Sequence, residues 1–183
     1  MAKWIAFFSQ TGSEIVNLSK ELGQVPELIV TNNDEGGYRG VTWHPGIREL
    51  GTTIMYAQHD RLVEYFTNNN VYPPSNTLIT LHGYLRIIPP EMCNKYEMYN
   101  GHPALITHYP ELKGKDPQER TWSGNHHTIG SVVHRVTEGV DEGEVLSSVA
   151  YANRSYTKDE LYLKLKQSSL EAWLWFLRRK LCE

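Results

Sequence analysis

Three residues in the second half of the sequence have side chains that together support acyl transfer. Asn100, His102 and Asp141 offer an amide, an imidazole and a carboxylate. An amide can hold a carbonyl oxygen, and an imidazole can carry a proton and stabilise an oxyanion. A carboxylate can raise the imidazole pKa and orient the ring. These are the parts needed to pass an acyl group to an amine. The alternative is two surface turns, because Asn-Gly and Asp-Glu-Gly are common turn sequences.

The segments around these residues occur in an informative order: Leu81–Pro90, Pro103–Leu112, Gly130–Val136 and Asp141–Leu146. In that order they resemble the folate-dependent formyltransferases, which read roughly Gly-Phe-Met-Arg-Ile-Leu, Asn-x-His-Pro-Ser-Leu, Gly-x-Ser-Val-His-x-Val and Asp-x-Gly-x-Val. The resemblance is closest to phosphoribosylglycinamide formyltransferase of purine synthesis, with some features of sugar-nucleotide N-formyltransferases. Each motif is weak alone. Their shared order and spacing carry the resemblance.

The resemblance implies roles for the three residues. Asn100 would donate a hydrogen bond to the formyl oxygen, and His102 would support the tetrahedral intermediate formed when an amine attacks the formyl carbon. Asp141 would hold His102 charged and help move the amine proton. The formyl donor would be 10-formyltetrahydrofolate, with no metal. Gly101 departs from the family, which usually has an apolar side chain there, and is expected to loosen the turn and admit a bulkier substrate.

A slot for the pterin ring is implied between the strand exit near residue 84 and the loop before Asp141. The alternative is that the strand exit only packs into the core, with Arg86 in a structural ion pair. The residues expected to contact folate are Tyr84, Leu85, Arg86, Ile88, Glu138, Gly139 and Val140.

The turn Thr11–Ser13 is a candidate site for the amine acceptor. It precedes a predicted helix, where an anion binds readily, and the matching loop holds the substrate phosphate in phosphoribosylglycinamide formyltransferase. Gly12 and Ser13 match that loop, whereas Gln10, Thr11 and Glu14 depart from it. A carboxylate beside a phosphate is repulsive, so the sequence favours a smaller or neutral group there.

A second candidate is the loop that contains Lys113 and Lys115. With Pro117 and Trp122 it resembles a pattern of the sugar-nucleotide and methionyl-tRNA formyltransferases. Either lysine could meet a phosphate of the acceptor. The alternative is a solvated basic loop.

The function predicted is formyl transfer from 10-formyltetrahydrofolate to a primary amine of a small acceptor of the nucleotide or sugar-nucleotide type. The expected partners are therefore folate and a small-molecule amine, bound by a monomer or homodimer. The alternatives are phosphoribosylglycinamide formyltransferase proper, a hydrolase that releases formate from formyltetrahydrofolate, and a silent folate-binding or nucleotide-binding module.

Alternating strands and helices must position these residues. The pattern predicts an α/β, Rossmann-like fold with a mainly parallel sheet and helices on both faces, the formyltransferase fold. In such sheets, ligands bind beyond the carboxyl ends of the strands where the strand order reverses. The expected strands are Lys3–Phe8, Glu27–Thr31, Val41–Trp43, Thr77–Leu81, Tyr96–Asn100, Ser131–Thr137 and Val145–Tyr151; the expected helices are Glu14–Leu22, Thr53–Thr67, Pro89–Asn94 and one opened by a capping box at Thr157, with a loop-rich stretch at 103–129.

Composition places few further limits on function. The 183 residues, 40% hydrophobic and 21% charged, predict one catalytic domain over residues 1–183. A net charge of −3 argues against a dedicated nucleic-acid surface. Cys93 and Cys182 fit no metal-ligand spacing, and the eight histidines form no HExxH motif, so no metal is expected. The apolar run Trp4–Phe8 is too short for a signal sequence and no stretch reaches transmembrane length, so a cytoplasmic protein is expected.

Overall fold

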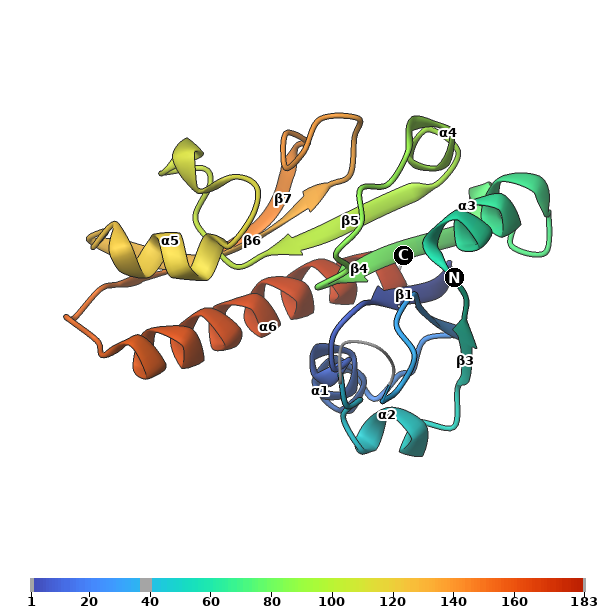
Figure 1. The fold of residues 1–183 in the computed structure, drawn as a ribbon, viewed down its shortest axis with the longest axis horizontal. Coiled ribbons are helices and arrows are strands. Elements are labelled where there is room, and N and C mark those ends of the chain that lie inside the picture. The colour runs from blue at the N-terminus through green and yellow to red at the C-terminus, as the bar shows by residue number, and fades with distance from the viewer. Residues whose placement is uncertain (1, 37–40, 183) are drawn as a thin grey trace.

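A seven-stranded sheet with the order β3-β2-β1-β4-β5-β6-β7 organises the protein (Figure 1). The computed structural model describes residues 2–36 and 41–182. The strands are β1 (Lys3–Phe8), β2 (Leu28–Thr31), β3 (Thr53–Tyr56), β4 (Thr77–His82), β5 (Glu97–His102), β6 (Thr128–Arg135) and β7 (Val145–Ala152). The helices are α1 (Ser13–Leu22), α2 (Gly46–Glu49), α3 (His59–Asn68), α4 (Pro90–Cys93), α5 (Pro117–Ser123) and α6 (Lys158–Cys182), with short 3-10 helices η1 (Pro74–Asn76) and η2 (Pro110–Leu112).

The strand order reverses between β1 and β4. From β1 the chain builds outward through β2 to β3, and it then returns to place β4 on the other side of β1. Strands β1 to β5 are parallel to one another, whereas β6 and β7 extend the sheet from β5 in antiparallel pairing. The predicted mainly parallel α/β sheet is therefore confirmed.

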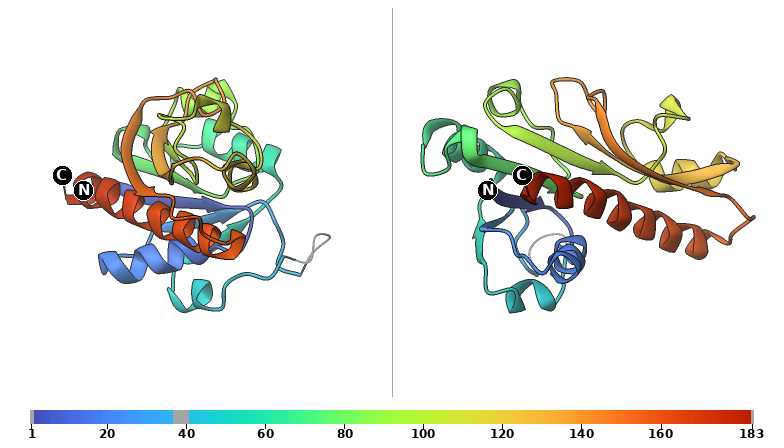
Figure 2. Two further views of the ribbon diagram at one scale, coloured as in Figure 1. Left: turned by 90° about the vertical axis from the view of Figure 1, so that its left-hand side faces the viewer. Right: turned by 180° about the vertical axis from the view of Figure 1, so that it is seen from behind.

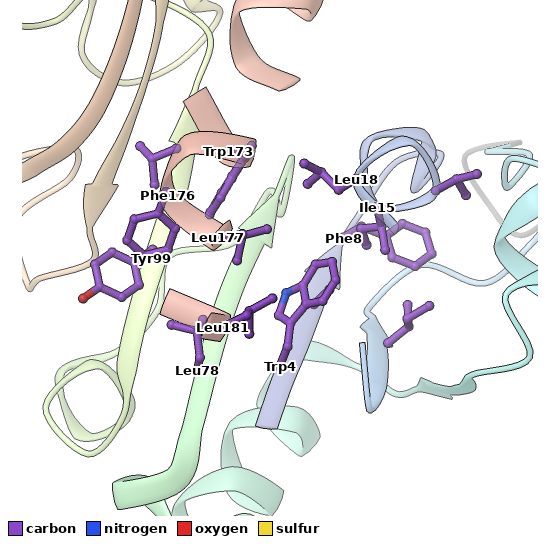
Figure 3. Close-up of a cluster of buried hydrophobic side chains, with 14 of the residues drawn as sticks. Trp4, Phe8, Ile15, Leu18, Leu78, Tyr99, Trp173, Phe176, Leu177 and Leu181 are labelled. Atoms are coloured by element: carbon purple, nitrogen blue, oxygen red, sulfur yellow. The ribbon is translucent and has the colours of Figure 1, made fainter. Parts of the chain in front are cut away.

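Helices cover both faces of the sheet. Successive side chains of a strand point to opposite faces, and in β1 the residues Trp4, Ala6 and Phe8 face α1 and α6, while Ile5 and Phe7 face α3 and α4. Figure 3 shows Trp4 and Phe8 meeting Ile15 and Leu18 of α1 and side chains of α6. Strands buried on both faces explain the near-continuous apolar sequence of β1.

Helix α6 begins at the predicted capping box. The backbone N–H of Thr157 donates to Glu160 Oε2 at 2.8 Å, and the Glu160 N–H donates to Thr157 Oγ1 at 3.4 Å. The helix then runs along the sheet, as the view from behind in Figure 2 shows, and it buries one face. The buried residues are Leu161, Leu165, Ser168, Ala172, Trp173, Phe176, Leu177 and Leu181. No helix within residues 2–36 and 41–182 has the length and apolar character needed to cross a bilayer.

Two local predictions were wrong, and a third was incomplete. Val41–Trp43 is not a strand; Trp43 instead packs its ring edge on Phe8, with ring centroids 5.7 Å apart. The predicted helix Thr53–Thr67 is split, because its first residues form β3 in parallel register with β2 and α3 begins at His59. The stretch 103–129 also contains a helix, α5, whose first residue is Pro117. Proline suits the first turn of a helix because its missing N–H has no helical partner there.

Candidate active site

Asn100, His102 and Asp141 meet at the carboxyl end of β5. Asn100 and His102 lie two residues apart on this strand, so their side chains share one face of the sheet. Asp141 lies in the loop between β6 and β7, with a left-handed backbone (φ 54°) that aspartate tolerates better than most residues. Its Oδ2 is 3.3 Å from His102 Nδ1. The structure therefore brings together the three residues that the sequence singled out.

The Asp141 carboxylate also contacts two further groups. Its Oδ1 is 3.2 Å from His134 Nε2, and its Oδ2 accepts the backbone N–H of Gly114 at 2.8 Å. Asp141 thus bridges two imidazoles, both of them buried. Burial by itself raises the pKa of Asp141, but the hydrogen bond from His134, the neighbouring His102 and the Gly114 N–H outweigh it, and the pKa falls below its ordinary value. The carboxylate is therefore ionised at neutral pH.

Burial has a larger effect on the pKa of His102 than the Asp141 carboxylate has. The imidazole is 4% exposed, and the loss of hydration lowers its pKa below the ordinary 6.5. Asp141 and the Leu112 carbonyl act in the opposite direction but do not restore the ordinary value. In the protein without substrate, desolvation thus outweighs the ion pair with Asp141, which acts in the direction expected from the sequence. His102 is a neutral base near pH 7.

Both nitrogens of His102 nevertheless face hydrogen-bond acceptors. Nδ1 points to Asp141, and Nε2 is 2.9 Å from the main-chain oxygen of Leu112. A neutral ring can donate to only one of them. An imidazolium donates to both, so the surroundings are ready for the proton that His102 would receive.

His134 is a site residue that sequence reasoning treated only as part of a strand. It pairs with Asn100 in the register of β5 and β6, and its Nε2 lies 3.2 Å from Asn100 Nδ2. Its Nδ1 is 2.9 Å from the Arg135 carbonyl oxygen. The available signal was the His within Gly130–Val136, one of the motifs that follow the family order. His134 Nε2 therefore lies within reach of both the Asn100 amide and the Asp141 carboxylate, and it can accept from the first or donate to the second.

Gly101 lies inside β5 opposite Val133 and not in a turn. A Cβ at this position would lie 2.4 Å from Nε1 of Trp173, a fully buried side chain of α6. The expectation that Gly101 loosens a turn and admits a bulkier substrate is therefore wrong. The space left by the missing side chain is filled by the indole from the opposite face of the sheet.

The residues expected around a pterin ring fall into two groups. Tyr84 and Ile88 are buried: the Tyr84 ring packs edge-on against Phe7, and its hydroxyl lies 2.9 Å from His59 Nδ1. Leu85 and Val140 are 56% and 51% exposed. Two further residues predicted there, Arg86 and Gly139, lie in the same two segments.

Each of the two segments expected to bind folate is held by a hydrogen bond to another part of the fold. Asn94, which follows α4, donates from its side chain to Glu138 Oε1 at 3.2 Å. Leu85 donates its backbone N–H to Ser9 Oγ at 2.8 Å, which ties the exit of β4 to that of β1. The strand exit is thus attached to the end of β1, and the loop before Asp141 to the residue that follows α4.

The Thr11–Ser13 turn leads into α1. Gly12 has a left-handed backbone (φ 72°), and the hydroxyls of Thr11 and Ser13 are 3.1 Å apart. The Glu14 carboxylate turns toward α6: one oxygen lies 2.8 Å from His82 Nδ1, and the other accepts a hydrogen bond from Ser169. Glu14 therefore has two hydrogen-bond partners. Their donors offset part of the repulsion between this carboxylate and a phosphate that the sequence led us to expect.

The loop with Lys113 and Lys115 passes beside the catalytic groups, because Gly114, which lies between the two lysines, donates its N–H to Asp141. Lys113 is half-buried and Lys115 exposed. Within residues 2–36 and 41–182, no three His, Cys, Asp or Glu side chains are grouped as metal ligands.

Comparison with known proteins gives consistent matches. A family model described as "Formyl transferase" matches residues 66–175, more than half of the chain. The chain is 26% identical over 151 residues to methionyl-tRNA formyltransferase of Caldicellulosiruptor saccharolyticus, a match that covers 76% of this chain and 47% of that protein. It is 26% identical over 133 residues to the trifunctional purine biosynthetic protein adenosine-3 of Chironomus tentans, covering 70% of this chain and 9% of that protein. The chain thus spans less than half the length of these curated relatives.

Two solved structures share the fold. The phosphoribosylglycinamide formyltransferase of Streptococcus pneumoniae TIGR4 superposes with a TM-score of 0.80 at 21% identity, covering 99% of both chains. The enzyme of the same name from Campylobacter jejuni gives a TM-score of 0.76 at 22% identity, covering 93% of both chains. At this identity the likeness shows the fold alone.

Proposed function

The chain belongs to the formyl transferase family, and from that premise we propose that it transfers a formyl group from 10-formyltetrahydrofolate to a primary amine of a small molecule. The observation that carries the proposal is the Asp141 carboxylate, which lies 3.3 Å from His102 and 3.2 Å from His134 beside the Asn100 amide. These groups lie where parallel α/β sheets bind ligands. We further propose that residues 1–183 act as one catalytic domain, because every named group comes from one sheet and its loops.

Each of the three residues has a defined task in this reaction. When the amine nitrogen bonds to the formyl carbon, the formyl oxygen gains negative charge, and the Asn100 amide donates a hydrogen bond to it. The attacking amine must lose a proton, which the neutral His102 takes up through Asp141 or a water between them. The imidazolium then donates to both Asp141 and the Leu112 carbonyl. Bound 10-formyltetrahydrofolate would supply the formyl carbon and the leaving nitrogen, and the His102 imidazolium would return its proton toward that nitrogen as the bond to the formyl carbon breaks.

The exposed apolar side chains at the sheet edge support a flat aromatic donor. Leu85, Ile87 and Val140 are 56%, 72% and 51% exposed, although large apolar side chains usually seek the core. Covering them with a ring would remove this surface from water. Tyr84 and Ile88 contribute through the main chain in this proposal, because their side chains are buried.

For the acceptor we propose an amine of the nucleotide or sugar-nucleotide type. Thr11, Gly12 and Ser13 offer hydroxyls and N–H groups at the start of α1, and Lys113 and Lys115 offer charge in the loop over the catalytic groups. Glycinamide ribonucleotide is the second candidate. It is favoured by the contacts of Glu14 with His82 and Ser169, which reduce repulsion of a phosphate.

The test is release of tetrahydrofolate with and without amines. Release that requires an amine supports the proposal, whereas release without one indicates a hydrolase. Comparison of kcat/KM for glycinamide ribonucleotide and amino sugar nucleotides under one set of conditions then separates the two acceptor candidates. If no amine is formylated and no formate is released, the proposed function is wrong.

Binding of the donor can be tested separately by calorimetry with a 5,10-dideaza folate analogue. Val140→Trp should weaken binding, because Val140 is exposed beside the proposed ring site and the larger side chain would occupy it. Val71→Trp is the matched control, since Val71 is also exposed but lies between α3 and β4. Absence of saturable binding by the unmodified protein at millimolar analogue would contradict the folate assignment.

A further inference from the structure

Residues 112–115, here called the strap, contact both His102 and Asp141. The Leu112 carbonyl lies 2.9 Å from His102 Nε2, and the Gly114 N–H donates to Asp141 Oδ2 at 2.8 Å. Both contacts use main-chain atoms, so the strap must keep its backbone path for the catalytic pair to keep its partners. Gly114 has φ 87°, a conformation in which an L-residue is strained.

The two ends of the strap differ in how they are held. The Leu112 side chain is buried with Ala104, Leu105, Ile106 and Val132, which fixes the first end. The other end is exposed at Lys115 and leads through Asp116, also left-handed, into α5. Packing therefore holds only one end of the strap.

Arg120 of α5 holds the other end. Its Nη1 donates to the carbonyl oxygen of Lys113 at 2.8 Å and lies 3.4 Å from that of Lys115. These carbonyls flank Gly114, the residue whose N–H binds Asp141. Both contacts use this one terminal nitrogen, whose two N–H groups can donate to two carbonyls of one short segment.

Arg120 also acts on His102 through its charge. Its cation lowers the pKa of His102, in the same direction as burial, the largest cause, and as the neighbouring His134. Asp141 acts in the opposite direction. His102 therefore faces two cationic or ionisable groups from α5 and β6 and one carboxylate from the loop between β6 and β7.

We propose that Arg120 is a positioning residue of the active site, which clamps the strap so that the Leu112 carbonyl and the Gly114 N–H hold His102 and Asp141 in place. The link to catalysis rests on the proposed function. The clamp itself rests on contacts among residues 102, 112–115, 120 and 141, none of which depends on the identity of the substrate.

The experiment compares Arg120→Gln, Arg120→Lys and the control Arg154→Gln, an exposed arginine in the loop between β7 and α6. Two quantities are measured for each: kcat for formyl transfer across a range of pH, and the titration of the His102 ring by NMR. The NMR readout needs no substrate, so it shows whether the Arg120 cation acts on His102 even if the proposed function fails, whereas kcat reports the clamp.

Arg120→Gln should lower kcat by about tenfold or more, because small misplacements of catalytic groups are costly. It should also move the His102 titration and the matching limb of the pH profile to higher pH, since a cation that lowers the His102 pKa is lost. Arg120→Lys keeps the cation but not the planar guanidinium that places Nη1 between the two carbonyls, so it should lose part of kcat while the titration stays near that of the unmodified protein. Arg154→Gln should change neither quantity.

Two outcomes overturn the proposal. One is an unchanged His102 titration and unchanged kcat in a folded Arg120→Gln variant. The other is full activity in Arg120→Lys together with a shifted His102 titration. This would show that turnover needs neither the guanidinium contacts nor the usual pKa of His102. If Arg120→Gln does not fold, Arg120→Lys decides, because the clamp requires it to lose activity without a shift in the titration.

Discussion

Two histidine–carboxylate pairs lie on opposite faces of the same sheet. His82 and Glu14 lie on the side of α1 and α6, with Nδ1 and Oε2 2.8 Å apart. His102 and Asp141 lie at the carboxyl edge, with Nδ1 and Oδ2 3.3 Å apart. The shorter pair is the one for which we propose no chemical role. A short distance between the two groups therefore does not identify a catalytic pair.

What differs is the set of remaining partners. The other nitrogen of His82 meets the Thr80 hydroxyl at 2.8 Å, and that hydroxyl accepts the Trp4 indole N–H at 2.8 Å. A hydroxyl can donate or accept, so this chain can satisfy either form of His82. His102 instead lies between two acceptors, Asp141 and the Leu112 carbonyl, that only its charged form can satisfy. The His82–Glu14 pair thus belongs to a buried network in which every group has a partner. The His102–Asp141 pair has all its hydrogen bonds only when His102 gains a proton.

The largest expected effect is on turnover. His102→Gln and Asp141→Asn should each lower formyl transfer by ~10² or more, the usual scale for general acid–base and oxyanion groups. Asparagine tolerates the left-handed backbone of Asp141, so folding should be little changed. The measurement is kcat/KM on the preferred amine, with His82→Gln expected to stay within a fewfold of the unmodified enzyme. Near-normal turnover in the His102 and Asp141 variants would show that this pair is no more catalytic than the pair of His82 and Glu14.

Gly101→Ala should disturb both faces at once. Its Cβ would press on Trp173, whose ring centroid lies 4.5 Å from that of His82, and its neighbours in β5 are Asn100 and His102. Overpacking of this kind costs about 1–3 kcal/mol in the free energy of unfolding. Denaturant titration should show this loss, and it should be smaller in the Trp173→Phe background. Equal losses in the two backgrounds would mean that the indole does not fill the space beside Gly101.

His82→Gln should lower stability rather than activity. It removes the link between Glu14 and Thr80 in a buried network, and a buried polar group left without its partner costs ~1–3 kcal/mol. The free energy of unfolding measured in urea is the test. Glu64→Gln is the control, because Glu64 takes part only in an exposed ion pair with Arg61. A stable His82→Gln variant with reduced turnover would reverse the roles given to the two pairs.

The smallest expected effect is on the pH dependence of stability. Burial lowers the folded-state pKa of His102 below 6.5, so between the two values the unfolded chain binds more protons than the folded one. Stability therefore falls as the pH drops through the region below about 6.5. Melting temperatures measured over this range should decline less in His102→Gln than in the unmodified protein. Parallel curves would show that burial does not control the His102 pKa.

The sequence predicted the elements that carry strong local signals. The buried β1, the capping box before α6 and the position of His102 at the carboxyl end of β5 were all predicted correctly. The split of Thr53–Thr67 into β3 and α3 was missed, because β3 is stabilised by pairing with β2 and not by local periodicity.

The contacts around the catalytic pair were beyond reach for a different reason. The strap binds His102 and Asp141 through main-chain atoms, which every residue possesses and no sequence pattern marks. Trp173 reaches Gly101 only through the packing of α6 on the sheet. The lowered pKa of His102 follows from burial, which a motif does not show. The sequence thus indicated which side chains meet but not the surroundings that tune them.

The long helix α6 has a consequence for how the protein comes to be folded in a cell. It is the last element in chain order, yet it covers Trp4 from the first strand, as Figure 3 shows. Its Ser169 bonds Glu14 across a separation of 155 residues. A nascent chain would therefore carry an uncovered apolar sheet face until translation of α6 is complete, and chains in that state are prone to aggregate. In the folded structure the β1 side chains of that face, Trp4, Ala6 and Phe8, are buried.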